Sequence, residues 1–231
     1  MLFSAILTMI RGGSVDLGSV IAQILSTLFI IVFILPLHEC AHGWMAVKLG
    51  DMTPKYDKRI TLNPLASIDP MGALCLLLFG YGWAKPVQVN PRNFRNPKTG
   101  MAIVALAGPL SNIIAALIGS IIFVPVALFG GNGALIGFIL TFLSSYIVIN
   151  ISLAAFNLIP LPPLDGSRIV AAFLSDRAMY AYYKYQNIIV MVFFFAMMSG
   201  ALSTPLNIVE GFIQNVIFFI AKLPYMLLGI I

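Results

Sequence analysis

The sequence is poor in charged residues and in cysteine, and each scarcity excludes a class of protein. Only 9% of its 231 residues are charged, whereas 60% are hydrophobic and the mean hydropathy is +1.00, which excludes a water-soluble globular domain. The two cysteines, Cys40 and Cys75, make no disulfide framework and are expected to behave as small buried hydrophobes. The formal net charge of +5 comes from basic residues scattered between apolar runs, as in membrane proteins, so no nucleic-acid partner is expected.

Long apolar runs are what the sequence has instead. A transmembrane helix needs about 20 mostly apolar residues, and such runs occupy 17–50, 101–128 and 134–156, with a shorter apolar span at 188–201. Pro36 should kink or split the first run. The tail from Leu206 mixes polar and apolar residues, so it is either a further span or an amphipathic helix at the membrane surface. The sequence predicts an all-α, polytopic integral membrane protein with a three-helix core plus additional spans, four to six in total.

Three shorter segments complete the predicted organisation. "MLFSAILTMI" has no basic residue before its apolar part and is predicted as an interfacial helix, not a cleaved signal. "MGALCLLLFG" is too short to span a bilayer. "AKPVQVNP", residues 84–91, has weak period-two character and is predicted as a short β-like segment in the loop after the first span. We expect a single membrane-embedded domain, 1–231, with an interfacial N-terminus (1–16), a core (17–175) and C-terminal helices (176–231).

The basic residues predict the orientation of the chain in the membrane. Eight Lys and Arg residues lie between Lys48 and Lys98, after the first span, and three lie between Arg168 and Lys184, after the third. The "GGNG" turn between the second and third spans has none. Because cytoplasmic loops are enriched in Lys and Arg, both basic segments should face the cytoplasm of a multi-pass protein of the cell membrane.

Both histidines of the chain lie in "LHECAHGW", at the end of the first span. His38 and His42 are four positions apart, so on a helix they project from one face and suit two ligands of one zinc ion. Glu39 can reach a water on that metal as a general base, and zinc would lower the pKa of the water to about 7 and polarise a carbonyl. Ionisable groups in a membrane are costly and therefore usually functional. The pattern predicts hydrolysis of a peptide bond.

A carboxylate is expected as the third ligand, because a catalytic zinc takes three protein ligands and no histidine remains. Asp165 is favoured, since it follows a proline-broken span on the side where the histidines emerge. Asp69 is the second candidate, although it could simply cap the turn that follows it. The other acidic residues occupy solvated or isolated positions: Asp16, Asp51, Asp57, Asp176 and Glu210.

The proline-rich break in "NLIPLPPLDGSRI", residues 157–169, is itself informative. Pro160, Pro162 and Pro163 forbid a regular helix there, and irregular backbone at membrane depth is tolerated only inside protein or along a wet cavity. Such a break could bring water to the metal. Asn157 at its start either donates to a substrate carbonyl or oxyanion, or bonds across helices.

Together these motifs resemble the site-2 protease family of intramembrane zinc metalloproteases. That family pairs HExxH with a distal NxxPxPxLDG, which are "HECAH" and "NLIPLPPLDG" here. The likeness covers about residues 30–175 and is closest to the short prokaryotic form without a PDZ domain. Ser67 is a departure, since relatives often have histidine before "IDP". Further similar stretches are "TLNPLASIDPMGAL", "GWAKPVQVNPRNFRNP" and "AGPLSN".

The resemblance implies an enzyme and the roles of its residues. His38, His42 and Asp165 would bind one Zn²⁺ per chain, with Glu39 as the catalytic base. The implied substrates are single-pass membrane proteins that are cleaved in or near their helix, as in regulated intramembrane proteolysis.

An unwound substrate could add as a strand to the predicted edge segment, which makes Val87 and Val89 candidate substrate contacts. Two other classes of function remain. The first is a metal- or proton-coupled membrane transporter or channel that uses His38, Glu39 and Asp165 as an ion relay. The second is an inactive binding protein, which is disfavoured because all four expected catalytic groups are present.

Overall fold

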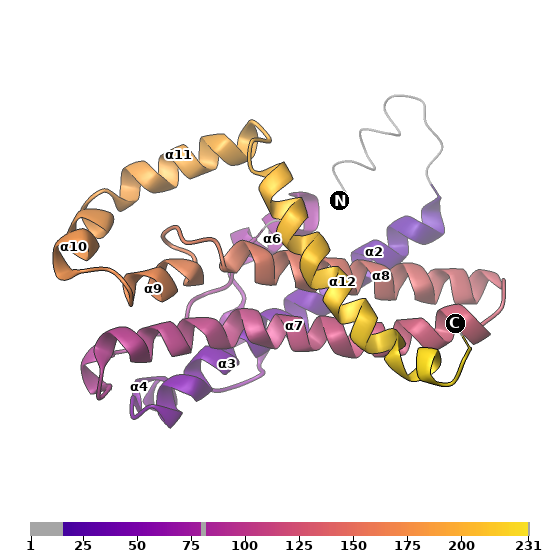
Figure 1. The fold of residues 1–231 in the computed structure, drawn as a ribbon, viewed down its shortest axis with the longest axis horizontal. Helices are drawn as coiled ribbons and strands as arrows, with labels where there is room; N and C mark the ends of the chain where they lie inside the picture. The colour runs from indigo at the N-terminus through magenta and orange to yellow at the C-terminus, as the bar shows by residue number, and fades with distance from the viewer. Residues whose placement is uncertain (1–15, 80–81, 231) are drawn as a thin grey trace.

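The computed structural model describes residues 16–79 and 82–230, and the described residues form helices joined by turns and loops (Figure 1). The interfacial helix predicted for the N-terminus falls mainly on residues 1–15, which lie outside the described residues. In chain order the helices are α2 (Leu17–Phe29), η1 (Ile30–Ile34), α3 (Leu35–Lys48), α4 (Thr53–Tyr56), α5 (Pro64–Ser67), α6 (Pro70–Phe79), η2 (Pro91–Asn93), α7 (Pro97–Phe129), α8 (Ala134–Asn157), α9 (Asp165–Ala171), α10 (Asp176–Lys184), α11 (Gln186–Met198) and α12 (Ser203–Leu227).

The first apolar run is one helix of 32 residues that contains a wider turn at its middle. Pro36 has no N–H, so the helix cannot keep its regular bonding pattern there. The missing hydrogen bond is accommodated by η1, a π-helical turn. In this turn the Leu35 N–H donates to the carbonyl of Ile30, five residues before it. The helix therefore stays continuous, so the predicted split is wrong, and its winding changes just before Pro36.

Four described helices are long and apolar enough to cross a membrane, which confirms the predicted polytopic all-α class. The apolar segment at 188–201 is different from its prediction, because α11 has only 13 residues and is too short to span. The tail qualifies, since α12 runs for 25 residues. The four candidate spans are Leu17–Lys48, Pro97–Phe129, Ala134–Asn157 and Ser203–Leu227.

The three N-terminal spans form the core that holds the polar motifs. α7 and α8 lie side by side, and α3 packs along α7 (Figure 1). Ile30, Ile34, Ala115 and Leu153 meet in one buried cluster that ties these helices together. α12 crosses α7 and α8, where Ile217 completes a second buried cluster.

The predicted β-like segment forms no strand among the described residues. Its only strand-like pairing is an isolated antiparallel bridge between Ile68 and Ala84. Pro86 has no N–H to donate, and the N–H of Val87 is taken by the Glu39 carboxylate, so no ladder can continue. Residues 84–90 instead form a loop, here called the strap, that contacts α3 at Glu39 and ends beside Asp51.

Candidate metal centre

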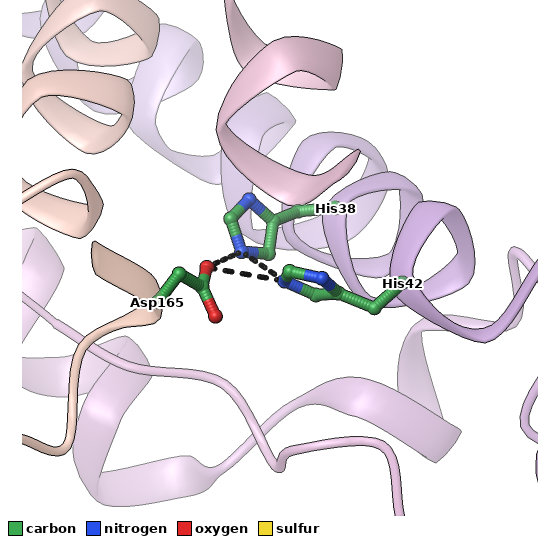
Figure 2. A group of neighbouring side chains, drawn as sticks. All are labelled: His38, His42 and Asp165. Atoms are coloured by element: carbon green, nitrogen blue, oxygen red, sulfur yellow. Dashed lines mark hydrogen bonds and ion pairs between the residues drawn. The ribbon is translucent and has the colours of Figure 1, made fainter. Parts of the chain in front are cut away.

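Three metal-binding side chains meet where α3 approaches the start of α9 (Figure 2). His38 and His42 project from successive turns of α3, and their Nε2 atoms lie 3.1 Å apart. One carboxylate oxygen of Asp165, Oδ2, lies 3.4 Å from the His38 Nε2 and 3.1 Å from the His42 Nε2. Both histidines are buried. The structure thus brings together groups that stand more than 120 positions apart in the sequence.

The outer nitrogen of each imidazole is engaged by α7, which fixes what the inner nitrogens can do. His42 Nδ1 lies 2.7 Å from the Val104 carbonyl oxygen, and His38 Nδ1 lies 2.9 Å from the Asn112 Oδ1. Because a carbonyl oxygen can only accept, each Nδ1 must carry the hydrogen. In the neutral rings, both Nε2 atoms therefore present lone pairs toward Asp165.

Gly108 of α7 lies directly over these lone pairs. A Cβ at this position would be 2.3 Å from the His42 Nε2 and 2.6 Å from the His38 Nε2. Such distances are far below any van der Waals contact, so a larger residue could not be accommodated without moving the histidines. The missing side chain is what lets the two imidazoles come this close to the backbone of α7.

These features fit a metal ion. Two imidazole lone pairs and one carboxylate oxygen would repel one another at 3.1 to 3.4 Å without a proton or a cation between them. A tetrahedral ion with bonds of about 2.0 to 2.1 Å holds its ligand atoms roughly 3.3 Å apart. Two nitrogens and one carboxylate oxygen are also the ligand types that a zinc site with three protein ligands uses.

The proline break between α8 and α9 positions Asp165 beside the two histidines. α8 ends at Asn157, the chain turns irregularly through the prolines, and Asp165 begins α9. Gly166 is required there, because a Cβ on it would lie 2.3 Å from the Leu158 carbonyl oxygen and 2.4 Å from that of Ile159. The glycine lets the new helix start against the end of the old one, which turns the preceding aspartate toward α3.

Glu39 is buried beside the histidines and held by the strap. Its Oε2 accepts a hydrogen bond of 2.8 Å from the Val87 N–H. The Val87 side chain is also buried, and it packs near Gly43, where a Cβ would come within 3.5 Å of it. One carboxylate oxygen of Glu39 is thus held in place by the strap.

Asp51 anchors the other end of the strap. This fully buried carboxylate accepts hydrogen bonds from the backbone and hydroxyl of Thr53, the Asn90 N–H and the Asn93 side chain. Burial alone would raise the pKa of Asp51, but the hydrogen bonds from Thr53, Asn90 and Asn93 outweigh it and hold the pKa below 3.8. The strap is therefore tied to the α3 end of the molecule by a charged carboxylate.

The remaining candidates lie outside the three-ligand cluster. Asp69 caps α6, since its Oδ1 accepts from the N–H groups of Met71 and Gly72, which is the simpler of its two interpretations. One amide N–H of Asn157 donates to the Leu153 carbonyl of its own helix. Val89 packs against a buried cluster that includes Phe94.

Sequence reasoning assigned no role to the α7 groups around the histidines. Val104, Gly108 and Asn112 recur every four residues and so share one face of the helix. The stretch "AGPLSN" shows this spacing, a glycine with an asparagine four positions later, but only the packing of α7 against α3 shows that this face meets the histidines.

Comparison with known proteins gives one family and two relatives. The model of peptidase family M50 matches residues 122–200. One relative is YwhC of Bacillus subtilis, which is named as a candidate zinc metalloprotease. It is 43% identical over 136 residues, which are 58% of this chain and 62% of that protein. A zinc metalloprotease of Methanocaldococcus jannaschii is 30% identical over 160 residues, or 69% of this chain and 37% of that protein. No solved structure gives a significant match.

Each alignment covers less than two thirds of the relative's own length. The matches agree with the family that the paired motifs indicated, and the family match includes the proline break and Asp165.

Proposed function

We propose that this chain, which belongs to peptidase family M50, the site-2 protease family, is an intramembrane zinc endopeptidase. Its reaction would be the hydrolysis of peptide bonds in or near the transmembrane segments of other membrane proteins. The observation that supports it best is the meeting of His38, His42 and Asp165 beside the buried carboxylate of Glu39. The catalytic part would be residues 17–175, with the active site toward the cytoplasm.

The proposed roles follow from the chemistry of each side chain. His38, His42 and Asp165 hold one zinc ion. Zinc, when bound, supplies a Lewis acid that acidifies water and polarises a peptide carbonyl. Glu39 takes the proton from the attacking water and returns it to the amine that leaves.

The strap and the proline break have proposed roles in binding substrate. The Val87 N–H holds one oxygen of Glu39, which orients the base. A substrate segment that has unwound from its helix would lie along the strap near Val87 and Val89 and bond to backbone groups other than the Val87 N–H, which Glu39 already takes. Asn157, at the end of α8, would donate to a substrate carbonyl in exchange for its bond to Leu153.

The proposal is tested by removing the base and leaving the ligands. In purified protein, Glu39→Gln should keep about one zinc per chain and lose cleavage of a transmembrane peptide by at least 100-fold, the lower range of a general base. Glu210, the other glutamate of the chain, lies in α12, so Glu210→Gln is the matched control and should cleave normally. Cleavage that survives in Glu39→Gln would refute the mechanism, and zinc binding without any cleavage in the unaltered protein would favour the ion relay.

A further inference from the structure

We infer that Asn112 of α7 is a positioning residue of the metal centre, which holds His38 in the tautomer and orientation that binding through Nε2 requires. This inference rests on the proposed zinc site and adds to it a residue that is not a ligand. It predicts that zinc affinity depends on a side chain that never touches the ion.

The two histidines are oriented by different kinds of group. His42 is held by the Val104 carbonyl, a backbone acceptor that no substitution removes. His38 is held by the Asn112 Oδ1 at 2.9 Å, so its hydrogen bond depends on one side chain. A metal-binding histidine usually donates its other N–H to such an acceptor, which fixes the ring and makes the ligand nitrogen more basic.

The environment of Asn112 supports this role over simple packing. Asn112 is 1% exposed, and among the described residues its Nδ2 has no hydrogen-bond partner. A buried amide with an unpartnered N–H is unfavourable compared with an apolar side chain of the same shape. Leucine would fill this position without that penalty, so the amide is explained by its Oδ1, which faces His38.

Asn150 provides a matched control. It is a second fully buried asparagine, on the neighbouring helix α8, and its Nδ2 donates to the Tyr146 carbonyl of its own helix while its Oδ1 has no partner among the described residues. Asn150→Leu therefore removes the same chemical group from the same kind of environment without touching a histidine.

The test is a zinc titration of the purified full-length chain against a chromophoric chelator. Asn112→Leu should weaken zinc binding by about 10- to 100-fold, whereas Asn112→Asp, which keeps the acceptor, and Asn150→Leu should stay within about threefold of the unaltered protein. Equal affinity of Asn112→Leu and the unaltered protein would overturn the inference. So would an equal loss in Asn150→Leu or in Asn112→Asp.

A second measurement decides the matter if Asn112→Leu does not fold. The chain has only two histidines, so a protein labelled with ¹⁵N-histidine shows only four ring nitrogens. With zinc bound, both Nδ1 atoms should carry hydrogen, and Asn112→Asp should shift the signals of one ring only. A His38 that binds zinc through Nδ1 would overturn the inference. If the unaltered protein binds no zinc at all, the proposed function itself fails, so the two failures are distinguishable.

Discussion

At the residue scale, we predict that the proposed metal centre depends on the missing side chain of Gly108 as well as on its three ligands. Gly108→Ala would place a methyl group 2.3 Å from the His42 Nε2 and 2.6 Å from the His38 Nε2. The histidines must then move apart or turn, and zinc affinity should fall at least tenfold, the lower end of the effect of disturbing groups around a metal. A competition titration with a chelator measures this loss.

Gly137→Ala is the control for that substitution. Gly137 also lies within a membrane-spanning helix, but a Cβ there would meet nothing within 4 Å. Its zinc affinity should therefore equal that of the unaltered protein. An unchanged affinity in Gly108→Ala would contradict the account, because it would mean that zinc binding does not depend on the close contact between Gly108 and the two histidines.

The sequence was enough to identify the residues with metal-binding side chains, but not the glycine that makes space for them to approach α7. The spacing of His38 and His42 and the isolation of Asp165 after a broken span are visible in one dimension. Gly108 is not, because small residues are common in membrane helices and only the register of α7 against α3 shows which of them faces the imidazoles. Asn112 was missed because the sequence does not show that its side chain faces His38 on another helix.

At the element scale, the strap over Glu39 is held by hydrogen bonds to buried carboxylates. We predict that Asp51→Asn loosens its far end, since an amide can accept from only part of the donors that Asp51 now satisfies. The expected loss of stability is about 1 to 3 kcal/mol, and it should appear as faster proteolysis near Asn90.

The same contact gives the strap a dependence on pH. The pKa of Asp51 in the folded protein lies below its ordinary value of 3.8, so the carboxylate stabilises the folded state fully above that value. The contribution disappears as the pH falls below 3.8 and passes through the folded pKa. Acid should therefore speed proteolysis of the strap in the unaltered protein, and Asp51→Asn should lack this component. An identical acid response in both proteins would contradict the role of Asp51.

The error in predicting a β-like segment also belongs to this scale. Alternation of Val87 and Val89 with polar residues is a weak strand signal, and it does not show what the backbone will bond to. Here the N–H of Val87 donates to the side chain of Glu39, which lies in α3, and not to a neighbouring strand. Of the predicted β-like segment, only the isolated bridge at Ala84 is present.

At the scale of the whole molecule, length and apolar composition were enough to predict the class and most of the spans. The tail could not be assigned, because α12 carries polar residues such as Glu210 among its apolar ones. The segment at 188–201 was assigned as a span from composition alone, although α11 ends after 13 residues. Hydropathy shows whether a segment can lie in lipid, whereas the length of the helix decides whether that segment can cross the membrane.

The orientation of the molecule is a prediction from its basic loops. In a background without Cys40 and Cys75, a cysteine at Asn132, in the exposed "GGNG" turn, should react with a membrane-impermeant maleimide on intact cells. A cysteine at Lys58, in the basic loop beside α3, should react only after the membrane is opened. The reverse pattern of labelling would place the metal centre on the outer side and contradict the proposed orientation.

The central claim is that one ion joins the histidines of α3 to an aspartate brought in by the proline break. Zinc content per purified chain tests it most directly, in the unaltered protein, in Asp165→Ala and in Asp69→Ala, whose carboxylate caps α6 instead. We predict about one zinc in the unaltered protein and in Asp69→Ala, and far less in Asp165→Ala, which keeps only two of the three ligands. A full complement of zinc in Asp165→Ala, or none in the unaltered protein, would contradict the account.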